Sequence, residues 1–142
     1  MPDKAVFAAL RLAVMRGVEV RILIPSCPDH AVAFKASTFY TYEMIQAGIK
    51  VFRYRPGFIH QKVILIDDTA AAVGSANLDN RSFRLNFEIM LLTVDGRFAR
   101  DVETMLTDDF AQSFEVDRSE FRSASMPNRL AMHVARLFTP IL

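Results

Sequence analysis

The sequence lacks the features that would tie its fold to a disulfide, a metal cluster or a membrane span. It contains a single cysteine, Cys27, which excludes an internal disulfide and offers no metal-ligand spacing. No apolar run approaches the roughly 18 residues that a transmembrane helix needs. Lys and Arg number 17 against 16 Asp and Glu, so the net charge of +1 lacks the basic excess typical of nucleic-acid-binding domains. Any chemistry is therefore expected to come from organic side chains.

The length and the apolar content indicate one domain that shares a surface with a partner. We expect a single domain over 1–142, with a core at 1–115 and a carboxyl-terminal tail at 116–142. Hydrophobic residues make up 51% of the chain, which is high for a domain of this size. Part of the apolar surface is therefore expected to be covered by another protein surface.

Helical and strand patterns alternate along the chain, which predicts an α/β fold with a mixed β-sheet flanked by helices. Asp3 is the predicted N-cap of the first helix and Gly17 its predicted stop. The other expected elements are strands at 18–24, 49–54, 58–66, 70–73 and 86–94, and helices at 31–46 and 98–114. The segment 128–138 is basic and apolar, and it is expected to form a helix that contacts a membrane surface or docks on the fold.

One stretch combines a nucleophile, a cation and hydrogen-bond donors at defined spacing. It reads H-x-K-x4-D-x6-G-S-x-N and comprises His60, Lys62, Asp67, Gly74, Ser75 and Asn77. On a strand, His60 and Lys62 project from one face roughly 7 Å apart, so the imidazole can reach a phosphorus atom while the ammonium neutralises an oxygen. Gly74 lets the backbone approach a phosphate, and Ser75 and Asn77 can donate to its oxygens. The spacing predicts phosphodiester chemistry on a β-hairpin.

Glu88 is the charged residue of the apolar strand expected at 86–94. A carboxylate within a buried strand is costly unless it is paired. We expect its partner to be His60, because a carboxylate on one imidazole nitrogen fixes the tautomer and supports the charge that grows during attack. The alternative is a salt bridge to Arg84 or Arg53.

Three further polar residues are assigned from their position in the chain. His30 lies in the loop after the first strand, where α/β sheets place ligands, and is either a substrate contact or a polar residue at a helix start. Arg81 lies in a basic segment suited to an anionic headgroup. Asp67 has the opposite strand parity from His60, so we interpret it as a structural residue of a turn.

The motif and its flanks resemble a known family. Residues 57–62 read Gly-Phe-Ile-His-Gln-Lys, and residues 76–88 read Ala-Asn-Leu-Asp-Asn-Arg-Ser-Phe-Arg-Leu-Asn-Phe-Glu. Both resemble the second HKD motif of bacterial cardiolipin synthases within the phospholipase D superfamily. The resemblance extends from residue 2 to residue 142 and corresponds to the carboxyl-terminal half of such an enzyme.

The resemblance implies a phosphatidyltransferase that acts on phosphatidylglycerol at the bacterial inner membrane. His60 would form a phosphohistidine, Lys62, Ser75 and Asn77 would hold the phosphate oxygens, and no metal or other cofactor is expected. The family uses a second motif as general acid, so a homodimer or a separate amino-terminal half is the expected partner. Nucleic acid is disfavoured by the near-neutral charge. The alternatives are a homodimeric phosphodiesterase or nuclease and an inactive fragment without the first motif.

Overall fold

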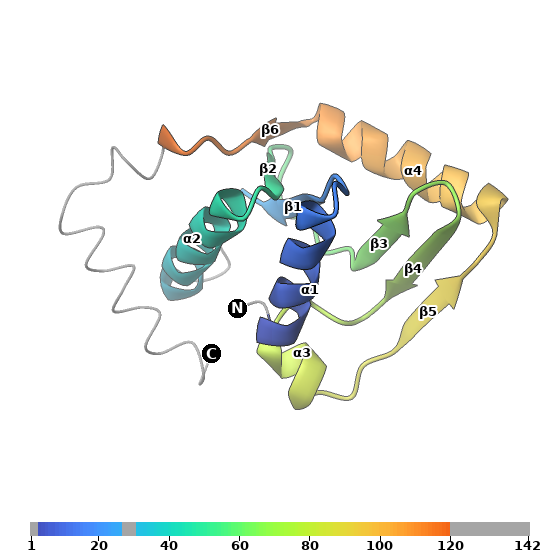
Figure 1. Cartoon of the computed structure of the whole chain (residues 1–142), viewed down its shortest axis with the longest axis horizontal. Helices are drawn as coiled ribbons and strands as arrows, with labels where there is room; N and C mark the ends of the chain where they lie inside the picture. The colour runs from blue at the N-terminus through green and yellow to red at the C-terminus, as the bar shows by residue number, and fades with distance from the viewer. Residues whose placement is uncertain (1–2, 27–30, 120–142) are drawn as a thin grey trace.

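The computed structural model describes residues 3–26 and 31–119 (Figure 1). The candidate substrate contact His30 and the tail helix expected at 128–138 lie outside these residues. The helices are α1 Lys4–Met15, α2 Ala31–Gln46, α3 Asn80–Arg84 and α4 Gly96–Ala111. The strands are β1 Arg21–Pro25, β2 Lys50–Tyr54, β3 Val63–Ile66, β4 Ala70–Gly74, β5 Met90–Thr93 and β6 Ser113–Glu115.

The described strands form two three-stranded sheets, which confirms the α/β class. The first sheet has the order β1-β2-β6 and is mixed, because β1 and β2 are parallel and β6 is antiparallel to β2. The second sheet has the order β3-β4-β5 and is antiparallel throughout. Within the described part of the chain, the one mixed sheet expected from the sequence is therefore divided into two.

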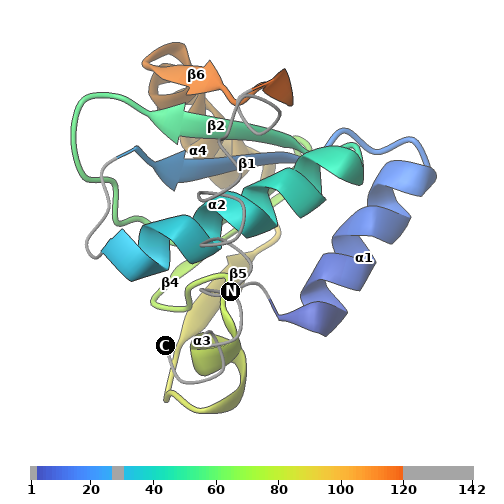
Figure 2. The same cartoon turned by 90° about the vertical axis from the view of Figure 1, so that its left-hand side faces the viewer.

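Helices cover the first sheet on both sides. Figure 2 shows α2 in front of the strands, α1 beside them and α4 behind them. The core between β2 and the helices α1 and α2 contains Met44, Ile49 and Val51, each at most 6% exposed. On the other side, α4 also contacts β3 and β4 and thus spans both sheets. Its close approach to β4 is possible because Ala71 and Ala99 are small and fully buried.

Asp3 begins α1 as predicted and also ties it to α3. Its carboxylate accepts hydrogen bonds from the backbone N–H groups of Ala5 and Val6 at 2.9 and 3.3 Å. Its other oxygen pairs with Arg84 Nε at 2.7 Å. Gly17 follows the helix with φ 87°, the left-handed conformation that glycine adopts without strain. These contacts connect the start of the chain to the helix beside the motif.

Several expected boundaries are wrong. The strand expected at 58–66 covers only Val63–Ile66, so His60 precedes it, and the strand expected at 86–94 covers only Met90–Thr93. The helix expected at 98–114 begins at Gly96, capped by Asp95, and ends at Ala111, because the following residues pair with β2 as β6. Pairing with β2 is a non-local interaction that periodicity does not reveal.

The helices of residues 3–26 and 31–119 are all too short or too polar to cross a bilayer.

Candidate active site

The antiparallel second sheet gathers the motif residues at one end. The motif histidine and lysine lie just before β3, Ser75 lies just after β4, and Glu88 lies just before β5. In an antiparallel sheet, the start of one strand adjoins the end of its neighbour. The pairing continues beyond the strands, since Gly74 N donates to Lys62 O at 3.1 Å and Ser75 N donates to Ile89 O at 2.9 Å. The hairpin therefore places the predicted phosphodiester residues together.

His60 is exposed and lies on an extended segment held from both sides. Its ring stacks on Phe58 with 5.5 Å between the ring centroids. Gln61 Nε2 donates to Asp109 Oδ2 of α4 at 2.6 Å, and Lys62 Nζ donates to His60 O at 2.9 Å. Within the described residues, the imidazole itself makes no hydrogen bond. Both ring nitrogens of His60 are therefore available for chemistry.

Glu88 accepts hydrogen bonds from three side chains, and none of them is the expected histidine. Its donors are Ser75 Oγ at 2.5 Å, Ser82 Oγ at 2.9 Å and Asn86 Nδ2 at 3.1 Å. These bonds, that from Ser75 first, and the nearby charge of Lys62 hold the pKa of the Glu88 carboxyl below its ordinary value. An ionised carboxylate has roughly four acceptor positions, so one position remains for an imidazole N–H. The expected pairing of Glu88 with His60 stays a prediction.

The arginine alternative for Glu88 is not what the structure shows. Arg84 pairs with Asp3, and the described partners of Glu88 are neutral donors. The expectation that residues 86–94 form a buried strand is also wrong. Phe87 is fully exposed and Ile89 is 76% exposed, and within β5 itself Leu91 and Leu92 are exposed as well.

Ser75 and Gly74 have structural roles in addition to their predicted ones. The single hydroxyl proton of Ser75 is donated to Glu88, and its oxygen accepts from the N–H of Ile89 at 3.1 Å. A Cβ at Gly74 would lie 2.1 Å from the carbonyl oxygen of Ile89. Gly74 thus permits the close approach of β5 to β4, and phosphate binding by Gly74 and Ser75 remains a prediction.

Asn77 and Arg81 lie on the segment that leaves β4. The side chain of Asn77 is exposed and has no hydrogen bond among residues 3–26 and 31–119, so its amide can donate to a ligand. Arg81 is exposed on α3. Asp67 lies in the turn between β3 and β4 with φ 50°, at the far end of the hairpin from His60. That position agrees with a turn residue, since aspartate tolerates this conformation.

Ser82 and Asn86 are residues that the sequence analysis did not identify. Both belong to the segment that carries Glu88, and both donate to its carboxylate. The available signal was that Asn86 lies two residues before Glu88 and Ser82 lies six residues before it. It was not decisive, because the path of the chain between α3 and β5 cannot be read from periodicity.

Exposed apolar side chains lie on α3, on the segment that carries Glu88 and on β5. We call the following residues the apolar face: Phe83, Leu85, Phe87, Ile89 and Leu91. In the extended segment before β5, the alternate residues Asn86 and Glu88 form the polar network. Phe87 and Ile89 therefore project to the opposite side of this segment from the polar network, although each is a sequence neighbour of Glu88.

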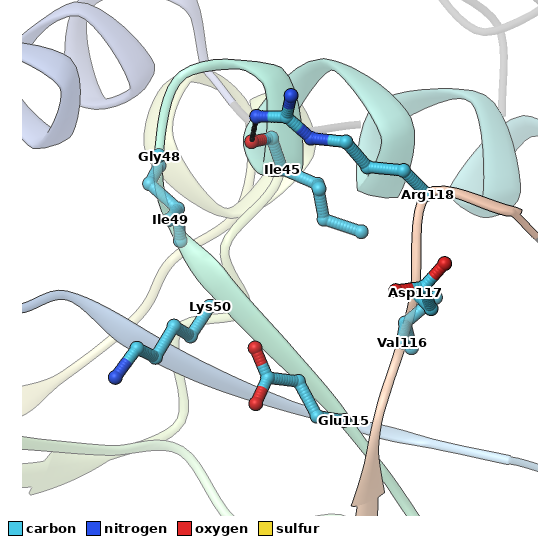
Figure 3. A pocket seen from close by; sticks show the side chains of 8 residues that line it. All are labelled: Ile45, Gly48, Ile49, Lys50, Glu115, Val116, Asp117 and Arg118. Carbon is cyan, nitrogen blue, oxygen red and sulfur yellow. Dashed lines mark hydrogen bonds between the residues drawn. The ribbon is translucent and has the colours of Figure 1, made fainter.

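A separate pocket of about 290 Å³ lies at the first sheet, between the end of α2 and β6 (Figure 3). Arg118 closes one side by donating to the carbonyl oxygen of Ile45 at 3.1 Å. None of the motif residues lines it. This pocket is therefore not the candidate active site.

Comparison with protein families gives a match over most of the chain. The family model described as "Cardiolipin synthase, PLD-like domain" matches residues 1–110. The chain is 61% identical over all 142 residues to cardiolipin synthase A of Pseudomonas fluorescens and covers 30% of that protein. It is 62% identical to cardiolipin synthase A of Pseudomonas aeruginosa and covers 29% of it. The chain thus spans about a third of these relatives, less than the half expected.

Two solved structures share the fold. The phospholipase D family member Nuc from Salmonella typhimurium aligns with a TM-score of 0.72 at 22% identity, covering 82% of this chain and 76% of Nuc. The phosphatidylserine synthase of Haemophilus influenzae aligns with a TM-score of 0.69 at 16% identity, covering 99% of this chain and 37% of the synthase. At these identities, the likeness concerns the fold alone.

Proposed function

The chain belongs to the PLD-like domain family of cardiolipin synthases, and from this premise we propose that it supplies one motif-bearing unit of a phosphatidyltransferase. The observation that carries the proposal is the convergence of His60, Lys62, Asn77 and Glu88 at one end of the second sheet. The substrate would be phosphatidylglycerol, so the unit would work at a membrane surface.

His60 is the nucleophile in this proposal. Its exposed ring attacks the phosphorus of a phosphatidyl group, a nitrogen–phosphorus bond forms, and the bond from phosphorus to the glycerol oxygen breaks. The hydroxyl of a second phosphatidylglycerol then attacks the phosphohistidine, which releases His60 and yields cardiolipin. Each displacement moves one phosphatidyl group, and glycerol is the other product.

The other site residues have electrostatic roles. Lys62 and the free amide of Asn77 bind the non-bridging oxygens, whose charge grows in the transition state. Arg81 contributes to headgroup binding from α3. Glu88, held ionised by its donors, uses its remaining acceptor position to orient the His60 ring. Since cationic side chains neutralise the phosphate, the proposal includes no metal.

The leaving glycerol oxygen needs a proton, and we assign its donor to a second motif-bearing unit. The apolar face supports a partner at this position, because contiguous exposed apolar surface on a protein marks an interaction site. Phe87 and Ile89 are the sequence neighbours of Glu88, so a unit that covers them contacts the segment that carries the carboxylate. The matched relatives extend well beyond this chain, which leaves room for such a unit.

A chimera provides the test. Cardiolipin synthase A of P. fluorescens, with its matched region replaced by this chain, is expected to convert phosphatidylglycerol to cardiolipin. The His60→Ala chimera is expected to form neither cardiolipin nor a covalent phospho-enzyme. A labelled phospho-enzyme in that variant would refute the nucleophile assignment. If the unmodified chain nicks plasmid DNA and the chimera makes no cardiolipin, the chain is a phosphodiesterase. Inactivity in both assays would indicate a unit that only associates with a partner.

A further inference from the structure

Ser82 is a buried serine inside the short helix α3, and its backbone is held by the helix cap. Only 7% of the residue is exposed. Its N–H donates to Asp79 Oδ1, the N-cap carboxylate, at 2.8 Å. A helix of five residues is not stable by itself, so such contacts decide where α3 and its side chains lie.

The Ser82 hydroxyl joins two parts of the candidate active site. Its oxygen accepts from the backbone N–H of Asn77 at 3.0 Å, and its proton is donated to Glu88 Oε1 at 2.9 Å. The direction of both bonds is unambiguous, because an N–H can only donate and an ionised carboxylate can only accept. One hydroxyl therefore links the phosphate-binding segment to the carboxylate.

The other serine on Glu88 does not make this link. Ser75 Oγ donates to Glu88 and accepts from the N–H of Ile89, so it connects the carboxylate to the start of its own strand. Asn86 lies two residues from Glu88 and likewise holds it locally. Among the described hydrogen bonds, the bridge from Asn77 to Glu88 passes through Ser82.

We propose that Ser82 is a positioning residue that sets the place of Asn77 relative to Glu88, and thereby the place of the phosphate relative to the His60 ring. The inference rests on the proposed function, in which Asn77 binds the phosphate and Glu88 orients the histidine. Ser82 itself does not contact the reacting atoms.

Removal of the hydroxyl has two physical consequences. Ser82→Ala leaves the Asn77 N–H without its acceptor, so the segment after β4 loses its fixed position. It also removes one donor to Glu88, so the pKa of that carboxyl rises toward its ordinary value. Because loss of a hydrogen bond to a charged group weakens an interaction by about tenfold, we expect formation of the phospho-enzyme to be slower by a similar factor.

The test uses Ser82→Ala, Ser82→Thr and the control Ser37→Ala. Ser37 is exposed on α2 and no described hydrogen bond involves its side chain. In the chimera, we expect Ser82→Ala to lower the rate of phospho-enzyme formation about tenfold and to shift the acid limb of the pH profile upward. Ser82→Thr, which keeps the hydroxyl, is expected to restore the rate, and Ser37→Ala to leave it unchanged. Melting temperatures show whether each variant folds.

A double-mutant cycle keeps the proposal falsifiable if threonine does not fit. If Ser82 acts through Glu88, Ser82→Ala should slow the Glu88→Gln chimera much less than it slows the unmodified chimera. Fully additive effects would overturn the proposal.

Two measurements on the unmodified chain separate this inference from the proposed function. NMR titration of the Glu88 carboxyl and hydrogen exchange of the Asn77 amide need no activity. A raised Glu88 pKa and faster exchange of the Asn77 amide in Ser82→Ala would support the link between Asn77 and Glu88. Failure of the chimera to make cardiolipin would refute the proposed function but not this link. Unchanged titration and exchange would refute the link.

Discussion

At the scale of single residues, charge and hydrogen bonding decide what Glu88 can do. Three neutral donors hold the carboxylate ionised, while the charge of Lys62 lies nearby. Neutral donors do not form an ion pair with the carboxylate, so its negative charge can support a positive imidazolium. An arginine partner would have cancelled that charge. The observed network therefore suits an orienting carboxylate better than the ion pair considered from sequence.

Glu88→Gln tests this role. The glutamine keeps the shape of the side chain but removes its charge, so we expect the chimera to fold normally and to lose roughly 100-fold in rate. In the unmodified protein, the lowered pKa keeps Glu88 ionised until the pH falls below the ordinary value of 4.5. Activity should then decline as Glu88 is protonated. An unchanged rate for Glu88→Gln would assign Glu88 a purely structural role.

Asp3 provides a residue-scale prediction for stability. Its pKa is lowered, most strongly by the hydrogen bond from Arg84. The Asp3 carboxyl is therefore harder to protonate in the folded state than in the unfolded state. The ionised carboxylate stabilises the fold above the ordinary pKa of 3.8, and this stabilisation is lost as the pH falls through the lowered pKa.

We expect Asp3→Ala, which loses the cap and the ion pair, to lower the melting temperature by roughly 5 °C at pH 7. Asp3→Asn keeps a capping side chain and loses only the ion pair, which is weak because Arg84 is largely exposed. Asp3→Asn should therefore lower the melting temperature less than Asp3→Ala does. Its difference from the unmodified protein should vanish in acid, where Asp3 is protonated. Equal melting temperatures for the two variants at pH 7 would contradict this division.

At the scale of elements, the second sheet is held in register by a close contact between β4 and β5. Gly74 opposes Met90 in the ladder, and a Cβ at Gly74 would also lie 2.8 Å from Met90 Cα. Neither backbone atom can move without separating the strands. The register of β5 in turn determines where Glu88 lies relative to Ser75.

Gly74→Ala is therefore expected to lower the free energy of unfolding by about 1–3 kcal/mol, the range for overpacking, in urea titrations. Gly96→Ala is the matched control, because its Cβ would meet its nearest neighbour at 3.4 Å, an ordinary contact, at the start of α4. That variant should be neutral or slightly more stable. Equal destabilisation of both variants would show that the close contact with β5 is not the cause.

At the scale of the whole molecule, the division into two sheets leaves one side unprotected. The first sheet is covered by helices on both faces, whereas β5 exposes most of its apolar side chains. Burial of apolar surface is the main favourable contribution to association. The apolar face is thus where a second motif-bearing unit is expected to bind.

The purified chain is expected to self-associate through this face, as measured by sedimentation equilibrium. Phe87→Asp and Leu91→Lys should shift the mass toward the monomer, because each places a charge in the interface. Met15→Lys is the control, since Met15 is an equally exposed apolar residue on α1. A shift of the same size for Met15→Lys would show that the association is not specific to the apolar face.

The sequence by itself determined the local features and the identity of the motif. The cap at Asp3, the stop at Gly17, the extent of α2 and the turn at Asp67 depend on neighbouring residues, so they could be predicted. The spacing of the motif residues also sufficed to indicate phosphodiester chemistry and the family.

Only the tertiary structure decided how the site is held together. Strand β6, the separation of two sheets, the exposure of β5 and the serine donors of Glu88 all depend on contacts between elements. Hydrophobic periodicity cannot predict such contacts. It indicates that a residue faces apolar surroundings but does not identify the element that it packs against. A polar network in an irregular segment, such as that around Ser82, has no period at all.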